Sequence, residues 1–189
     1  MARTAHPLLA VALGSALVVG FAPAATSSPP QREVIHDPFS VDIDGFCDVP
    51  GFDVRNEGVV TGTSIRRFRG PAGTVYFTDH IDVSQTITNL ATGHFVTAKE
   101  STITKDLRIT DNGDGTLTII VLATGNFTVK NERGKAISRN PGQVRFRAVI
   151  DDNGTPSNPD DDVELSFEQI KGSTGRTDDF CTAVVVAIA

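Results

Sequence analysis

An acidic segment in the C-terminal half of the chain has the greatest density of groups that could bind a cation. Residues 151–162 read DDNGTPSNPDDD and contain five carboxylates and two asparagine amides. Hard cations such as calcium take six to eight oxygen ligands from flexible loops. The segment therefore predicts a weak calcium site, although its spacing does not match an EF-hand, with the candidate ligands Asp151, Asp152, Asp160, Asp161 and Asp162. The alternative interpretation is a solvated hairpin loop rich in turn-forming residues.

A second candidate site lies on a segment in which apolar and polar residues alternate. Tyr76, His80 and Asp82 are separated by even numbers of positions, so in a strand their side chains share one face. A histidine beside a carboxylate can act as a general base, and these three residues form the candidate ligand pocket. No nucleophile or oxyanion partner is recognisable by spacing. The alternative interpretation is a polar outer face with an exposed histidine.

Three arginines surround one phenylalanine in the segment Arg66-Arg67-Phe68-Arg69. Such a group could hold an anionic ligand. The alternative is a strand end whose charges keep a sheet edge soluble. The sequence has no glycine-rich phosphate loop and no motif of the serine hydrolases or zinc proteases, which favours a binding protein over an enzyme.

The two cysteines, Cys47 and Cys181, stand far apart in the sequence. In an exported protein their natural state is a disulfide, which would bring the first and last elements of the domain together. A catalytic thiol and a metal site are the alternatives. The histidines show no spacing typical of metal ligands.

The elements that must position these groups are expected to be strands. Val75, Phe77, Ile81 and Val83 recur at even spacing, which is typical of a strand, and residues 95–110 form another long candidate. Residues 117–124 are apolar on both faces and predict a central strand. Gly125 is expected to bend or bulge the chain before residues 127–129, and residues 131–142 are expected to form a loop.

A hairpin over residues 144–170 is the clearest predicted unit. If Asp151 faces Asp162, the apolar residues Phe146 and Ala148 face Phe167 and Leu165. The same register places Arg145 opposite Glu168 on the other face of the hairpin. One register therefore gives both buried apolar pairs and a pair of opposite charges.

The two ends of the chain differ from this pattern. Residues 1–24 combine Arg3 and His6, a fifteen-residue apolar run and an Ala-Pro-Ala sequence ending at Ala24, which is typical of a secretory signal peptide. The apolar run is shorter than the ~20 residues of a spanning helix. Residues 25–44 are expected to be a loose leader, and residues 45–189 the folded domain. Residues 178–189 favour a short helix capped by Asp178 over a strand.

Composition narrows the fold class and the class of partner. The formal net charge is −6, which argues against nucleic-acid binding by bulk charge. The chain has no Trp, one Tyr and 21 threonines, and threonine favours strands. Seven or eight evenly spaced strands predict a single all-β domain, an antiparallel meander β-barrel with a β-sandwich as the alternative.

Several short motifs resemble those of small secreted actinobacterial β-proteins of unassigned function. They include an alanine-rich export signal, Gly45-Phe46-Cys47, the turn Thr88-Asn89-Leu90-Ala91-Thr92-Gly93 and Asp179-Phe180-Cys181. The strand pattern is also similar in architecture to the barrels of allene oxide cyclase and dirigent proteins. The resemblance implies a secreted β-protein and no catalytic residue.

Two functions are compatible with these features. The first is a secreted extracellular module that binds a small apolar ligand or a cell-surface partner, without a cofactor other than weakly bound calcium and without a membrane span. The second is a cyclase-like barrel enzyme whose polar pocket includes His80. The location of the Tyr76–His80–Asp82 face discriminates between them, because the enzyme requires this face to line a cavity.

Overall fold

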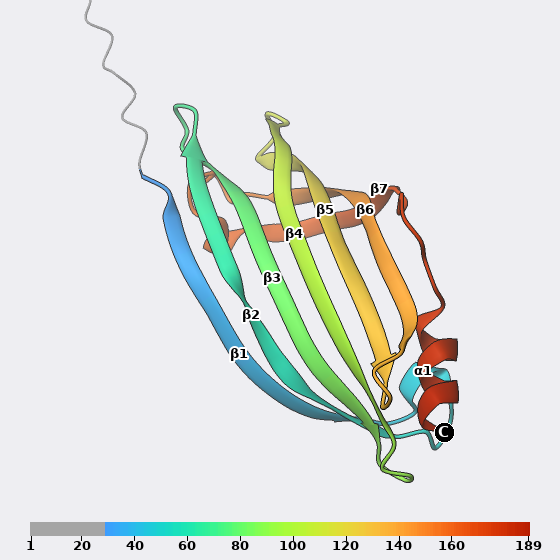
Figure 1. Ribbon diagram of the computed structural model, residues 1–189. Coiled ribbons are helices and arrows are strands. Elements are labelled where there is room, and N and C mark those ends of the chain that lie inside the picture. The colour runs from blue at the N-terminus through green and yellow to red at the C-terminus, as the bar shows by residue number, and fades with distance from the viewer. Residues whose placement is uncertain (1–28) are drawn as a thin grey trace, which may run out of the picture.

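Seven strands form one antiparallel sheet in the computed structural model, which describes residues 29–189 (Figure 1). Neighbours in the sheet are also neighbours in the sequence. The strands are β1 (Gln31–Ile43), β2 (Val54–Arg69), β3 (Thr74–Asn89), β4 (Phe95–Asp111), β5 (Thr116–Asn131), β6 (Ala136–Asp151) and β7 (Val163–Lys171). Two 3-10 helices, η1 (Phe46–Asp48) and η2 (Pro159–Asp161), and the α-helix α1 (Phe180–Ile188) complete the elements. The predicted all-β class, the meander order and the short C-terminal helix are confirmed.

The sheet is not closed by strand pairing. Within the part of the chain that the structure describes, β1 pairs only with β2, and β7 pairs only with β6. At the upper end in Figure 1, the loop between β6 and β7 reaches back to β2, where Arg66 Nη1 lies 3.4 Å from Asp160 Oδ1. Among residues 29–189, side chains therefore join the two halves of the sheet at this end without hydrogen bonds between β1 and β7.

The pleat gives the sheet two chemically different faces. The inner face carries Val96, Ala98 and Val129, which are buried against α1. The outer face carries the residues between them, among which Lys99 is paired with Thr128 of the next strand. Side chains alternate strictly along a strand, so the register assigns every paired residue to one of these faces.

The main core lies between the lower end of the sheet and α1 (Figure 1). Val184 and Ile188 of α1 are fully buried there together with Val54 and Ile87 from β2 and β3. The helix begins after Asp179, whose Oδ1 accepts a hydrogen bond from the Thr182 amide at 3.0 Å. Asp179 is thus the N-cap in place of the predicted Asp178.

The C-terminal end of α1 is held by the turn between β3 and β4. Buried Asn89 donates from Nδ2 to the Ile188 carbonyl oxygen at 2.9 Å, and the Thr92 hydroxyl donates to the same oxygen at 3.1 Å. The last carbonyls of a helix have no partner within the helix. The Thr-Asn-x-Ala-Thr-Gly motif therefore has a structural role here.

The N-terminal segment differs from the prediction. Residues 31–43, expected within a loose leader, form β1 and pair with β2 along their whole length. Only Ile35, Phe39 and Ile43 are half-buried, and Asp37 interrupts the apolar alternation, so the sequence pattern of this edge strand is weak. The predicted signal peptide, residues 1–24, lies outside the described residues.

β5 is one long strand through Gly125. Its pairing with β6 continues without a bulge from Thr116 to Val129, and Gly125 faces Gly142. A Cβ atom on Gly125 would lie 2.5 Å from the Thr102 hydroxyl, so this glycine permits a close approach and not the expected bend. The loop expected at 131–142 is also shorter, because β6 begins at Ala136.

The β6–β7 hairpin forms, but its register differs from the prediction by two residues over most of its length. Ala148 pairs with Phe167, and Arg147 pairs with Glu168. One residue of the shift is present from the start, where Asp151 pairs with Val163 and not with Asp162, and an irregularity at Leu165 adds the second. Phe167 therefore pairs with the inward Ala148 as a residue of the same face, whereas Val163 pairs with the outward Asp151. Consequently Arg147, and not Arg145, forms the ion pair with Glu168.

β7 is exposed along its whole length, contrary to the expected burial of its apolar residues. Leu165 and Phe167 are 56% and 54% exposed. Phe167 does stack on Phe146 with the ring centroids 4.9 Å apart. The reason for the exposure is that β7 is an edge strand with a neighbour on one side only.

A disulfide joins Cys47 to Cys181, with the Cα atoms 5.6 Å apart and 134 positions between them in sequence. It attaches α1 to the segment that leads from β1 into β2. In the chain-entropy model, a loop of this size stabilises the fold by roughly 4–5 kcal/mol.

Replacing both cysteines by serine should therefore lower the free energy of unfolding by up to about 4–5 kcal/mol, measured by denaturant titration. A reductant should shift the wild-type midpoint and leave that of the double variant unchanged. Equal midpoints for oxidised and reduced wild-type protein would contradict the prediction.

The burial pattern predicts unequal effects of two truncations. Ile188→Ala removes a fully buried side chain and should cost roughly 2–5 kcal/mol of stability. Leu165→Ala, at the exposed edge, should cost less than about 0.5 kcal/mol. Thermal unfolding of both variants measures the difference, and a larger effect of Leu165→Ala would show that β7 is covered in solution.

Candidate functional site

The outer face of the central strands is built from hydroxyl, amide and amino groups. The register places Ser84 of β3 beside Lys99 of β4, and Lys99 beside Thr128 of β5. One row further along, Thr97 faces Lys130. Exposed threonine suits a strand whose outer face contacts water, since its β-branched side chain packs well on a pleated surface. The local sequence thus presents polar groups at regular intervals.

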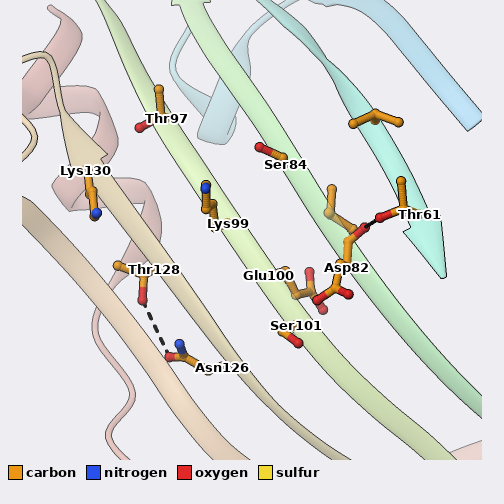
Figure 2. A pocket seen from close by; sticks show the side chains of 12 residues that line it. Thr61, Asp82, Ser84, Thr97, Lys99, Glu100, Ser101, Asn126, Thr128 and Lys130 are labelled. Atoms are coloured by element: carbon orange, nitrogen blue, oxygen red, sulfur yellow. Dashed lines mark hydrogen bonds between the residues drawn. The ribbon is translucent and has the colours of Figure 1, made fainter. Parts of the chain in front are cut away.

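These rows enclose an open hollow of about 530 Å³ on the outer face, on the side of the sheet away from α1 (Figure 2). Four strands, β2 to β5, contribute to it. Its outward-facing polar lining consists of Thr61, Asp82, Ser84, Thr97, Lys99, Ser101, Asn126, Thr128 and Lys130. Glu100 also borders the hollow, although the register assigns it to the inner face.

Several polar groups of the hollow, among them the two ammonium groups, are free to contact a partner. The Thr61 hydroxyl donates to the Asp82 carbonyl at 3.4 Å, and the Thr128 hydroxyl donates to Asn126 Oδ1 at 3.5 Å (Figure 2). Lys99 and Lys130 are exposed, and neither forms an ion pair with another described residue. The hollow can therefore offer two ammonium groups and several hydroxyls to one polar ligand.

The predicted pocket residues do not form one site. His80 Nε2 lies 3.7 Å from Asp82 Oδ2, and both side chains are about half exposed. Of the three, only Asp82 lines the hollow. The face that they share is the outer face, which matches the alternative interpretation of a polar surface.

Tyr76 lies near the upper end of the sheet, where its side chain contacts neighbouring residues of the fold. Its hydroxyl oxygen accepts a hydrogen bond from the Ile109 amide at 3.3 Å, and the Arg69 guanidinium lies 4.4 Å from its ring centroid. Arg69 and its neighbours do not converge on one point either. Arg66 lies over Phe77 on the inner face, which separates it from Arg69.

The acidic loop uses its carboxylates within the loop. Asp152 is buried, and its Oδ1 accepts from the Gly154 amide at 3.0 Å. Both carboxylate oxygens of Asp161 lie 2.9 Å from the Thr155 hydroxyl. Asp160 is the exception, because it lies 3.4 Å from Arg66 of β2 and ties the loop to the sheet.

Charge repulsion is nevertheless present in this loop. Burial raises the pKa of Asp162 above its usual value, and the nearby charges of Asp161, Asp152 and Asp160 raise it further. Among the described residues, no group of three or more His, Cys, Asp or Glu side chains is arranged to hold a metal ion. Calcium binding by the loop stays a prediction.

Two carboxylates on the inner face were not identified from the sequence. The Ser64 hydroxyl donates to Asp79 Oδ1 at 2.6 Å, and the Phe77 amide donates to Asp106 Oδ2 at 2.8 Å. Burial raises the pKa of Asp106, the Phe77 hydrogen bond opposes this rise, and the Asp79 charge adds to it. The charged form of Asp106 is therefore disfavoured on the inner face.

Sequence reasoning also missed most of the hollow. Lys99, Ser101, Thr128 and Lys130 occupy outward positions that alternate with buried residues, and this alternation was the available signal. What the sequence did not show is the register that places these residues of four strands beside one another. A site assembled from neighbouring strands has no motif of its own.

Comparison of the chain with protein-family models, with curated proteins and with solved structures finds no match. The described residues contain no helix long and apolar enough to span a membrane. The candidate site therefore rests on its own geometry, and the resemblance to secreted actinobacterial β-proteins stays a prediction.

Asp106→Asn should stabilise the protein at pH 7, because burial raises the pKa of Asp106 and disfavours its charged form in the folded state. A raised pKa in the folded state means that the folded protein binds the proton more tightly than the unfolded chain does. Ionisation of Asp106 therefore costs stability as the pH rises. The amide keeps an acceptor for the Phe77 amide and carries no charge.

The stabilising effect of Asp106→Asn should shrink as the pH falls through the folded-state pKa of Asp106, because the wild-type carboxyl is then neutral as well. Thermal unfolding between pH 3 and pH 8 measures it. Glu33→Gln, at an exposed position of β1, is the control and should show no comparable pH dependence. A stabilisation independent of pH would refute the assigned cause.

Proposed function

We propose that the protein is a secreted extracellular module that binds a cell-surface partner through the hollow on its outer face. The observation that carries this proposal is the position of the hollow, an open depression of about 530 Å³ lined by polar groups on the face away from the core. A domain that buries its apolar residues on one face and offers free hydrogen-bonding groups on the other is suited to binding at that second face.

Export is supported by the signal-peptide pattern of residues 1–24 and by the Cys47–Cys181 disulfide. Structural disulfides persist in oxidising compartments and are rare where thiols are kept reduced. The combination favours a working environment outside the cytosol.

A polar surface partner fits better than a small apolar ligand. Ten of the twelve residues that line the hollow carry polar groups and none is aromatic, although Val59, Val83 and the aliphatic parts of the polar side chains make up much of its surface. Pockets for small apolar ligands are mostly lined by hydrophobic and aromatic side chains. The enzyme alternative is disfavoured by the position of His80, which is about half exposed on the outer face and does not line the hollow.

Filling the hollow tests the proposal. Ser101→Trp places a bulky neutral side chain among the lining residues, and Thr110→Trp is the matched control on the same face of β4, nine positions away. The protein is collected from the medium of a secreting bacterial host, where its mass should correspond to a chain beginning after Ala24. Binding to isolated actinobacterial cell walls is then measured by co-sedimentation.

We expect wild-type protein and Thr110→Trp to sediment with the walls, and Ser101→Trp to lose at least about tenfold in affinity, which corresponds to 1.4 kcal/mol. Thermal unfolding should show that both variants are folded. Equal sedimentation of the two tryptophan variants, or no sedimentation of the wild type, would refute the proposed function.

A further inference from the structure

The cations of β4, β5 and β6 all lie on the outer face. The register places seven lysines and arginines there: Lys99, Lys105, Arg108, Lys130, Arg139, Arg145 and Arg147. We call these seven residues the basic strip. The inner face of the same three strands carries no lysine or arginine and three acids, Glu100, Asp106 and Asp111. Asp151, at the upper end, is the one acid on their outer face.

The separation of cations and acids between the two faces is not a consequence of composition, since the whole chain has a formal net charge of −6. It depends on a bulge. Lys105 and Arg108 are separated by an odd number of positions and would point to opposite faces of a regular strand. The register shift between Asp106 and Arg108 returns Arg108 to the outer face. The local structure thus keeps both cations on one side.

The basic strip has the dimensions of an extended polymer site. Lys99, Lys130 and Arg139 surround Thr128 at its lower end, beside the hollow. Lys99 and Arg108 are nine positions apart on β4, about 30 Å at the rise of a strand. β4 and β6 are two strand spacings apart, about 10 Å.

Most of this positive charge is not neutralised. Among residues 29–189, Arg147 is the only member of the basic strip in an ion pair, with Glu168. Arg145 Nε is shielded from water and has no hydrogen-bond acceptor in the described structure. Unpaired cations at this density repel one another, and an anionic partner would remove that repulsion.

We propose that the partner of the outer face is an anionic polysaccharide, which lies along β4 to β6 with its charged groups on the basic strip and its hydroxyls on the hollow. The inference rests on the proposed function and adds the chemical class of the partner. Between the cations lie Ser101, Asn126, Thr124 and Gln143, whose groups match sugar hydroxyls. The outer face of these strands has one aromatic residue, Phe95, whereas single-stranded nucleic-acid sites stack bases on several.

Binding to dextran sulfate and to neutral dextran of the same length tests the charge dependence, measured by affinity electrophoresis at several salt concentrations. We expect binding to dextran sulfate alone, weakening as salt increases. The triple variant Lys99→Gln, Lys130→Gln, Arg139→Gln should bind at least about tenfold more weakly. It should also show a smaller salt slope, because binding with fewer cationic contacts releases fewer counterions from the polymer.

The matched control is Arg32→Gln, Arg133→Gln, Arg176→Gln, which changes the net charge equally at exposed positions outside the basic strip. It should bind like the wild type, and thermal unfolding should show both triple variants folded. Equal weakening by the two triple variants would overturn the inference, since net charge alone would then explain binding.

Two further arms separate this inference from others. A 30-base-pair DNA duplex and vesicles containing phosphatidylglycerol present the same charge in other macromolecules, and binding to either as tight as to dextran sulfate would overturn the assignment to a polysaccharide. If Ser101→Trp abolishes wall binding while the basic-strip variant binds walls like the wild type, the inference fails and the proposed function stands.

Discussion

The two-residue alternation of the strands is the constraint on which the rest of this molecule depends. Six successive antiparallel pairings carry one assignment of faces from β1 to β7. A slip of one residue in any pairing would exchange the faces of every later strand. The buried residues Val96, Ala98 and Val129 determine which face of the central strands points inward. Turning these side chains to water would lose the free energy of their burial.

The lower end of the sheet adds a second, local constraint. α1 covers the inner face there and is attached at both ends, by the disulfide near its start and by Asn89 and Thr92 at its last carbonyl. A nine-residue helix is marginal by itself in water. These attachments explain how so short a helix can complete the core.

The sequence was sufficient for features that repeat locally. The alternation in β3 and β4, the apolar centre of β5 and the short C-terminal helix were all recognisable. The sequence was insufficient where the burial of a residue depends on which other elements cover it. The apolar residues of β7 read as core because alternation does not distinguish an edge strand from a covered one. Its register shift arises partly in the loop, where Asp151 pairs with Val163, and partly at Leu165, and a bulge has no sequence pattern of its own.

The candidate site shows the same limit. His80 and Asp82 were chosen for their chemistry, yet their neighbours on the outer face are ordinary threonines, serines and lysines. Lys99 and Thr128 come from different strands and meet only through register. Residue type identified a plausible acid–base pair, whereas the hollow is a property of four strands together.

The odd number of strands in the meander has a further consequence. In an antiparallel series, the first and seventh strands run in the same direction, so β1 and β7 could pair directly only as parallel neighbours, with the slanted hydrogen bonds of that arrangement. One added strand, running opposite to both, would complete an all-antiparallel ring of eight. Both free edges therefore have the strand direction needed to pair with the same added strand. One additional antiparallel strand would be the smallest extension that closes this open sheet into a barrel.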